Sequence, residues 1–245
     1  MTGRSGWQKA FQAGHAPLAV DALHRAWHHL VAVAPKDFNA ACKEPALTER
    51  LCLYLMHTRA SDRLTGLWSY ENSQGELVFQ DGKVTVAKRK RTDIRYYTNH
   101  EQPELDLIFE FKKLSHQKAQ RDKYLGNEGL GRFITGEYSI GQPAALMVGI
   151  LTTHEDDCVP PLMRWINSPD ARTLLYMESS EGRAIRKPSN LFPVAHFDTE
   201  HVRPVKKGPA HGTIVVSHLF LGFPSLPRAA TRRKRRANLQ DALDG

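Results

Sequence analysis

Apolar residues recur at helical spacing in two segments near the start of the chain. A first helix is expected over residues 16–33, because Pro35 cannot continue it. Its apolar face comprises Leu18, Leu23, Trp27, Leu30 and Val31. A second helix is expected from Glu44 to about Arg59, since Pro45 suits a first helical turn. Its apolar stripe comprises Leu47, Leu51, Tyr54 and Leu55. Glu44 stands at the end of this stripe, so its side chain is expected to point toward whatever the helix packs on, whereas Glu49 lies off the stripe.

Residues 75–114 show strand-like patterning, with short apolar and alternating runs separated by turn signals. Asp81-Gly82 is a hairpin turn signal, and residues 99–104 form a second polar turn. The segment therefore predicts three or four short strands in a meander.

A helix is expected next, over residues 115–133, with breaks at its glycines. These glycines are Gly126, Gly129 and Gly131. The continuous apolar run 144–151 is typical of a strand buried on both faces. Pro160-Pro161 is expected to open a short helix through Ile166, and further strands are expected at 174–177 and 213–223.

This order of elements predicts an α+β fold around one central mixed sheet flanked by helices. We place a single domain at residues 1–225, which is long enough for one substantial core. Residues 226–245 form a basic tail that is expected to be flexible, and its arginine-rich run either solubilises the chain or contacts nucleic acid.

Composition narrows the class of protein further. No run of about 18 apolar residues is present, and the first residues lack the plan of a secretory signal, so no membrane association is expected. The odd, irregularly spaced Cys42, Cys52 and Cys158 disfavour a disulfide framework or a structural zinc site and indicate a reducing cytoplasm. The net charge of +8 favours an anionic partner such as nucleic acid.

The strand at residues 105–114 carries the candidate chemistry. Because side chains alternate along a strand, Glu110 and Lys112 share one face, and the apolar side chains of the other face must be buried. If the preceding turn is symmetric about the bond between Glu101 and Gln102, Asp93 lies opposite Glu110, at a Cβ separation of about 5 Å.

Two carboxylates this close repel each other unless a cation lies between them. Ligands that are all oxygen suit Mg²⁺, Mn²⁺ or Ca²⁺ rather than zinc. The ammonium group of Lys112 beside them could orient a water molecule and offset charge on a phosphate oxygen. These groups supply the parts for hydrolysis of a phosphodiester by water. The alternative is a salt-bridge ladder on a solvated sheet face, against which stand the neighbouring apolar residues Ile94 and Ile108.

These residues resemble the PD-(D/E)XK nuclease superfamily over about residues 40–152. The family's aspartate corresponds to Asp93, and its ExK motif to Glu110, Phe111 and Lys112, whereas Thr92 stands where the family often has proline. Many members add a glutamate from the first core helix, for which Glu44 is the candidate and Glu49 the fallback.

The resemblance implies a restriction-endonuclease-like α-βββ-α-β core and a Mg²⁺-dependent nuclease, with Mn²⁺ as a possible substitute. A C-terminal extension over about residues 156–225 would complete the sheet or shape substrate access. DNA is the implied substrate, with RNA as an alternative and endo- or exonuclease action left open. A role in bacterial defence, as a homodimer or with partner subunits, follows from the resemblance alone. The competing hypothesis is a nucleic-acid-binding or interaction module that does not cleave.

Four basic residues are candidates for nucleic-acid binding: Lys88, Lys90, Arg95 and Arg132. Arg132 is expected near the end of the helix that follows the strands, either contacting a phosphate or simply exposed on the surface. Two groups of histidines invite a metal interpretation, but their spacing fits no metal template, and solvated or structural positions are expected for them. They are His24, His28 and His29 in the first helix, and His196, His201, His211 and His218 near the end.

Overall fold

A computed structural model places eight stretches of the chain, and its helices and strands lie within them. They are residues 14–59, 61–80, 83–98, 105–139, 142–177, 184–203, 212–224 and 226–228, with the backbone alone at 72–78 and 85–90. The helices are α2 (Ala16–Val33), α3 (Glu44–Thr58), α4 (Lys118–Leu125), α5 (Leu130–Ile134), α6 (Glu155–Ile166) and α7 (Pro169–Leu174). The strands are β1 (Leu67–Gln80), β2 (Lys83–Thr98), β3 (Leu105–Leu114), β4 (Ala144–Leu151), β5 (Phe197–Val202) and β6 (Thr213–Leu221).

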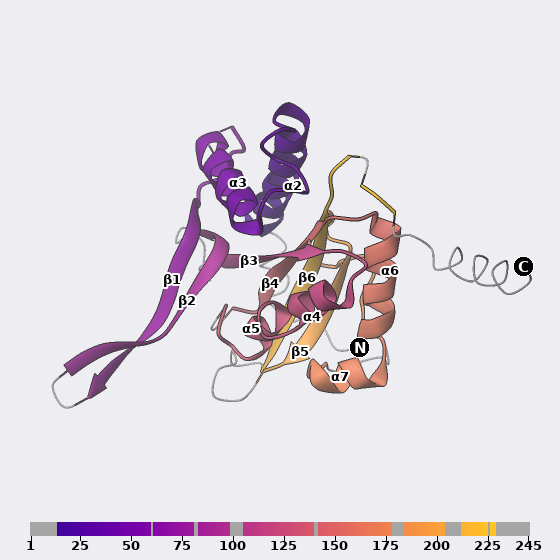
Figure 1. The fold of residues 1–245 in the computed structure, drawn as a ribbon. Helices are drawn as coiled ribbons and strands as arrows, with labels where there is room; N and C mark the ends of the chain where they lie inside the picture. The colour runs from indigo at the N-terminus through magenta and orange to yellow at the C-terminus, as the bar shows by residue number, and fades with distance from the viewer. Residues whose placement is uncertain are drawn as a thin grey trace, which may run out of the picture.

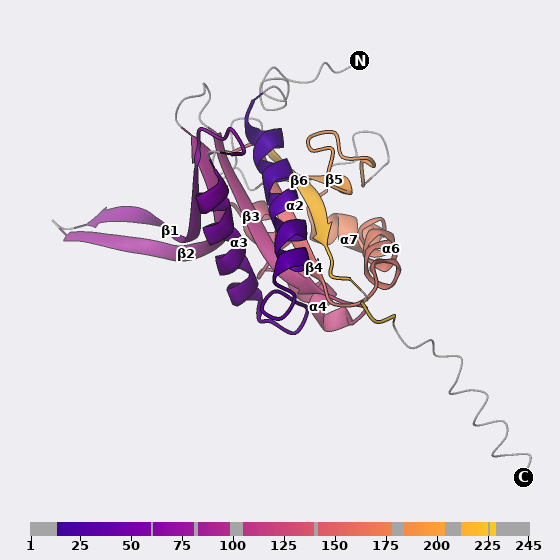
Figure 2. The same ribbon diagram turned by 90° about the horizontal axis from the view of Figure 1, so that it is seen from above.

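The strands form one six-stranded sheet in the order β1-β2-β3-β4-β6-β5 (Figure 1). The pairs β3–β4 and β4–β6 are parallel and the other three are antiparallel, so the sheet is mixed. Helices α2 and α3 cover one face, and α4, α5 and α6 pack on the other (Figure 2). The predicted α+β class with a central mixed sheet flanked by helices is confirmed.

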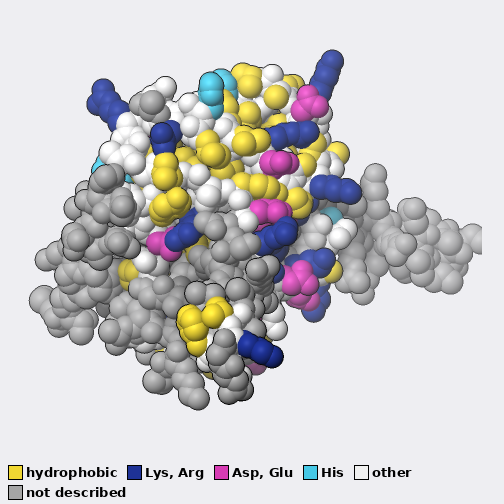
Figure 3. All heavy atoms as spheres, turned by 90° about the vertical axis from the view of Figure 1, so that its left-hand side faces the viewer, with side chains coloured by type: hydrophobic (Ala, Val, Ile, Leu, Met, Phe, Trp, Pro, Cys, Tyr) yellow, Lys and Arg dark blue, Asp and Glu magenta, His cyan; other side chains and the backbone are white. Residues whose placement is uncertain are grey.

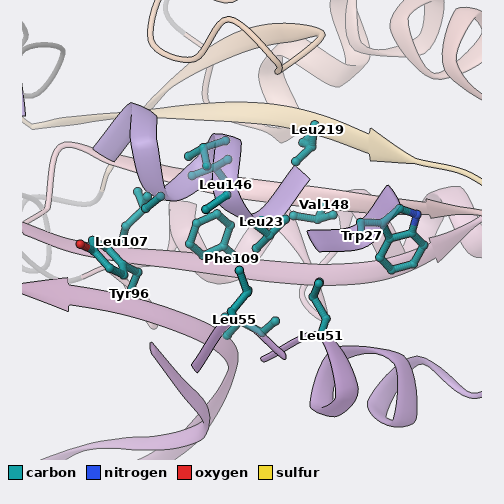
Figure 4. Close-up of a cluster of buried hydrophobic side chains, with 14 of the residues drawn as sticks. Leu23, Trp27, Leu51, Leu55, Tyr96, Leu107, Phe109, Leu146, Val148 and Leu219 are labelled. Atoms are coloured by element: carbon teal, nitrogen blue, oxygen red, sulfur yellow. The ribbon is translucent and has the colours of Figure 1, made fainter. Parts of the chain in front are cut away.

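Each face of the sheet has its own hydrophobic core. Alternate residues of β3 divide between them, since Leu107, Phe109 and Phe111 pack under α2 and α3 while Ile108 packs under α4 and α5. Figure 4 shows the first core, in which the buried indole of Trp27 also donates a hydrogen bond to the carbonyl oxygen of Gly222 at 2.9 Å. Strand β4 is buried along its whole length, as its unbroken apolar run predicts.

Most predicted elements are confirmed, but the meander consists of three strands, of which the first two are longer than predicted, and the first begins at Leu67, before the predicted segment. Helices α2 and α3 begin at the predicted residues, and the helix after β3 is broken into α4 and α5 at its glycines. Leu18 was expected on the buried face of α2 but is half exposed. The register Gln80↔Lys83 confirms the predicted hairpin, although residues 81–82 and the turn at 99–104 lie outside the described stretches.

Two predictions after residue 151 are wrong, and one strand there was missed. Helix α6 begins at Glu155, not at Pro160, because three acidic residues favour its first turn and the His154 side chain accepts a hydrogen bond from the Asp156 N–H. The strand expected at 174–177 is the end of α7 plus a single bridge from Met177 to His201. Strand β5 was not predicted at all, because it consists largely of polar residues.

The C-terminal segment completes the sheet. Strand β6 pairs with the central strand β4, and β5 forms the edge beyond it. The sheet therefore includes strands well past residue 151. Helix α2, from the N-terminal part of the chain, shares a hydrophobic core with β6.

Strands β1 and β2 continue beyond the sheet as a two-stranded arm (Figures 1 and 2). Near its end, Phe79 pairs with Val84, and their exposed fractions are 74% and 58%. Lys88 and Lys90 belong to this arm, where the structure describes their backbone but not their side chains. Figure 3 shows the side of the molecule that carries the arm, where described hydrophobic, basic and acidic side chains are mixed.

Close packing around Gly149 in β4 gives a test of this core. A Cβ atom there would lie 2.6 Å from Cδ1 of Phe220, so the Gly149→Ala variant is expected to lose about 1–3 kcal/mol of unfolding free energy. Gly222→Ala is the control, since its added Cβ has no contact closer than 3.6 Å. Urea unfolding of both variants measures the difference, and equal midpoints would contradict this packing.

Candidate functional site

Strands β2 and β3 separate at the point where the acidic residues lie. Their register runs from Thr98↔Leu105 to Ile94↔Phe109, so its continuation would place Asp93 opposite Glu110, as the symmetric turn predicts. Beyond the pair Ile94↔Phe109, the backbone N–H groups of Phe111 and Lys113 in β3 donate to carboxylates and not to the backbone of β2. Oδ2 of Asp93 accepts a hydrogen bond from the N–H of Phe111, and Oε2 of Glu44 accepts one from the N–H of Lys113, both at 2.8 Å.

Three carboxylates converge on one ammonium group at this opening. The Nζ atom of Lys112 lies 2.8 Å from Oε1 of Glu110, 3.2 Å from Oε1 of Glu44 and 4.0 Å from Oδ2 of Asp93. It also donates a hydrogen bond to the carbonyl oxygen of Phe111 at 2.7 Å. We call these four side chains, Glu44, Asp93, Glu110 and Lys112, the acidic centre.

The acidic centre draws its residues from elements that are distant in sequence. Glu44 is the first residue of α3, where the partial positive charge of a helix N-terminus favours a carboxylate. Glu49 is exposed, so the structure brings Glu44, not the fallback Glu49, to Asp93 and Glu110. The centre thus lies along the side of β3 where its pairing with β2 has ended, between the face covered by α3 and the face covered by α5.

Burial distinguishes this cluster from a surface salt-bridge ladder. The Glu110 side chain is fully buried, and the exposed fractions of Lys112, Glu44 and Asp93 are 12%, 24% and 25%. A solvated sheet face would leave these groups open to water. Buried charges are costly unless they are paired, and here Lys112 and Arg132 provide the partners of the buried Glu110.

Burial also shifts the proton affinities of the carboxyl groups. It raises the pKa of Asp93 to about 6, although Lys112 and the Phe111 N–H oppose this. Burial and the charge of Asp93 raise the pKa of Glu110 to about 8, again against the pull of Lys112. Burial disfavours the charged form of Lys112, but the three carboxylates outweigh it, so the pKa of Lys112 is raised.

We therefore expect the stability of the metal-free protein to fall between about pH 4 and about pH 8. Unfolded carboxyl groups titrate near pH 4, so in this window the folded state holds protons that the unfolded state has released. The stabilisation is fully present below the unfolded pKa values and is lost as the pH rises through the folded ones.

Calorimetry in EDTA checks this expectation. The melting temperature of the wild type should drop more between about pH 5 and about pH 8 than that of Glu110→Gln, which lacks the titrating group with the higher pKa. Equal drops in the two proteins would show that Glu110 does not hold a proton in the folded state.

Arg132, on α5, reaches the acidic centre from the opposite layer. Its Nη1 atom donates hydrogen bonds to Oε1 of Glu110 at 2.9 Å and to the hydroxyl of Tyr138 at 2.6 Å. The Tyr138 hydroxyl in turn donates to the carbonyl oxygen of Arg91 in β2. Tyr138 was missed by the sequence reasoning, because a lone tyrosine in a loop gives no pattern that would single it out.

The other sequence candidates lie away from the acidic centre. Arg95 forms a two-point ion pair with Asp106 of β3, at 2.6 Å and 2.9 Å. His24 and His28 contact each other on α2. His201 and His218 are buried in a hydrogen-bonded chain through Thr199, and His211 lies outside the described residues. None of the three cysteines, all of them in described stretches, forms a disulfide.

The acidic centre fits a divalent cation in the kind of its donors. Its ligating atoms would all be carboxylate oxygens, and Oε2 of Glu110 is buried without a hydrogen-bond partner among the described residues. Across those residues, no group of three or more His, Cys, Asp and Glu side chains is already spaced to hold a metal. The carboxylates converge on the Lys112 ammonium instead, so a metal would require this group to move aside.

Comparisons of the chain with family models, with curated proteins and with solved structures found no match. Among the helices that the structure places, none has the length and apolar character needed to cross a membrane.

Proposed function

We propose that this chain is a Mg²⁺-dependent nuclease of the PD-(D/E)XK type, built on a restriction-endonuclease-like core. The observation that carries the proposal is the convergence of Glu44, Asp93 and Glu110 on Lys112 where β2 and β3 separate. When all three are ionised, these carboxylates repel one another, and the Lys112 ammonium and the Arg132 guanidinium together offset only two of their three charges. Such an arrangement is expected to attract a further cation.

Glu44, Asp93 and Glu110 would hold the Mg²⁺ ion, or Mn²⁺ in its place. When bound, the ion lowers the pKa of a ligating water and polarises the phosphoryl group. Lys112, no longer neutralised by the carboxylates, donates hydrogen bonds to the attacking water or to a phosphate oxygen. The hydrogen bonds from the β3 edge limit the movement of the Asp93 and Glu44 carboxylates, so the main rearrangement needed for a cation to bind is the departure of the Lys112 ammonium.

The distribution of basic residues supports a phosphodiester substrate. The run 88–91 is entirely basic and directly precedes the segment that carries Asp93 along β2. A phosphate backbone bound along this strand would lead into the opening between β2 and β3. DNA is our proposed substrate, with RNA as an alternative. Cutting both strands of a duplex calls for two such centres, so we propose a homodimer or a complex with partner subunits. A setting in bacterial defence rests on the resemblance alone.

A cleavage assay tests this proposal. The full chain is incubated with supercoiled plasmid, single-stranded DNA or RNA, in Mg²⁺ and in EDTA. Cleavage of at least one substrate in Mg²⁺ and of none in EDTA is expected. Binding to DNA without cleavage in either buffer would favour the non-catalytic binding module instead.

A further inference from the structure

A chain of hydrogen bonds crosses the gap between β2 and β3 on the side away from Glu44. It starts at the carbonyl oxygen of Arg91 in β2, passes through the Tyr138 hydroxyl and the Arg132 guanidinium, and ends on Oε1 of Glu110 in β3. The guanidinium carbon of Arg132 also lies 5.1 Å from the ring centre of Tyr138, within range of a cation–π contact. The two side chains therefore act as one unit.

This unit lies where the backbone ladder no longer joins the two strands. The last described pair between them is Ile94↔Phe109, so at Arg91 and Glu110 side chains alone set the distance from β2 to β3. Tyr138 is fully buried, and its hydroxyl has partners on both sides. The width of the opening therefore depends on this bridge together with the hydrogen bond from the Phe111 N–H to Asp93.

The segment that carries the bridge is itself anchored from the C-terminal part of the chain. The buried guanidinium of Arg203, just after β5, donates hydrogen bonds to the carbonyl oxygens of Phe133, Tyr138 and Ser139. These carbonyls belong to Tyr138 itself and to the residues that directly follow Arg132 and Tyr138. The side chains of Arg132 and Tyr138 therefore project from a backbone that Arg203 holds in place.

Arg132 also determines which oxygen of Glu110 is occupied. Both Arg132 and Lys112 donate to Oε1, whereas Oε2 is buried and has no hydrogen-bond partner within the described part of the chain. A carboxylate held by one oxygen presents the other in a defined direction. Outer partners that orient a metal ligand in this way strongly affect metal affinity.

We infer that Arg132 and Tyr138 are positioning residues of the acidic centre, fixing the orientation of the Glu110 carboxyl group through Oε1 so that it can act as a ligand of the cation. The inference rests on the proposed function. It assigns the Arg132 guanidinium to Glu110 and not to a phosphate of the substrate. Tyr138 acts through Arg132 and through its contact with β2.

Calorimetric titration of the metal-free full chain with Mn²⁺ alone tests this role. Arg132→Met and Tyr138→Phe are each expected to weaken Mn²⁺ binding by about 10–100-fold. Arg132→Lys, which keeps the charge but loses the planar donor geometry, should fall between Arg132→Met and the wild type. If Arg132→Met does not fold, Tyr138→Phe, which removes a single oxygen atom, carries the test.

Two matched variants control for loss of stability alone. Arg186→Met removes an arginine paired with Glu200, and Tyr96→Phe removes a buried hydroxyl that accepts a hydrogen bond from the Gly66 N–H, both away from the acidic centre. Both should bind Mn²⁺ as tightly as the wild type.

The possible failures are distinguishable. If the wild type binds Mn²⁺ and Arg132→Met and Tyr138→Phe bind it equally well, the positioning role is wrong while the proposed function stands. If Arg132→Met weakens DNA binding in EDTA and leaves Mn²⁺ affinity unchanged, Arg132 contacts phosphate and the inference is overturned. If the wild type binds no Mn²⁺, the proposed function fails and the inference with it.

Discussion

Replacing Lys112 with methionine is expected to lower the rate of Mg²⁺-dependent cleavage by about 10²–10³-fold, the usual effect of losing a donor that stabilises developing charge. The same change should make the metal-free protein less stable. The ammonium group of Lys112 lies between three carboxylates, and without it the Arg132 guanidinium on Glu110 offsets less of their repulsion. A divalent cation bound there would replace the missing charge. Mg²⁺ should therefore raise the melting temperature of Lys112→Met more than that of the wild type, even though the variant cleaves poorly.

Lys113→Met is the matched control for this experiment. Lys113 follows on the same strand, and its ammonium group binds the carbonyl oxygen of Ala40 instead of a carboxylate. The variant keeps the hydrogen bond that the backbone N–H of residue 113 donates to Glu44. We expect wild-type cleavage and a wild-type response to Mg²⁺. Undiminished cleavage by Lys112→Met would show that the ammonium group does not take part in the reaction. If Mg²⁺ stabilises this variant no more than the wild type, the ammonium group does not share its place with a metal.

Replacing Glu110 with glutamine is expected to reduce cleavage by about 10³-fold or more. A metal ligand supports several kcal/mol of transition-state stabilisation, and each 1.4 kcal/mol is about a tenfold change in rate. Near neutral pH the variant should nevertheless be about as stable as the metal-free wild type. Burial raises the pKa of Glu110 to about 8, so the wild-type side chain is largely protonated there and the amide resembles it.

Glu49→Gln separates this effect from a general loss of negative charge. Glu49 is exposed on the same helix as Glu44 but lies off the acidic centre, so its variant should cleave like the wild type. The measurements are the rate of Mg²⁺-dependent cleavage and the melting temperature of the wild type, Glu110→Gln and Glu49→Gln. A Glu110→Gln enzyme with substantial activity would remove Glu110 from the set of metal ligands.

The sequence alone predicts the arrangement of the three members of the acidic centre that lie on β2 and β3. Alternation along β3 assigns Glu110 and Lys112 to one face, and the symmetry of the turn aligns β2 with β3 from Ile94 onward. Both follow from local geometry. Glu44 could be placed because the helical stripe gives its direction, although its contact with the Lys113 N–H spans a large sequence distance.

The parts that could not be predicted depend on contacts between distant segments. Strand β5 does not alternate between apolar and polar residues, and its buried Asp198 is satisfied by the hydroxyl groups of Ser189 and Ser217, which no local pattern reveals. The role of Tyr138 depends on a loop held by Arg203 from the far end of the chain. The separation of β2 from β3 could not be predicted either, because the strand-like sequence pattern of both segments continues through this point without interruption.

Anomalous diffraction from crystals of the full chain soaked in Mn²⁺ tests the central claim most directly. We expect a peak between the carboxylates of Asp93 and Glu110, about 2.0–2.4 Å from their oxygens, with Lys112 moved away from its present place among the carboxylates. The absence of a peak at this position, with the Lys112 ammonium still bound to Glu110 and Glu44, would contradict a metal-dependent centre. A peak confined to the His24–His28 pair would do so equally.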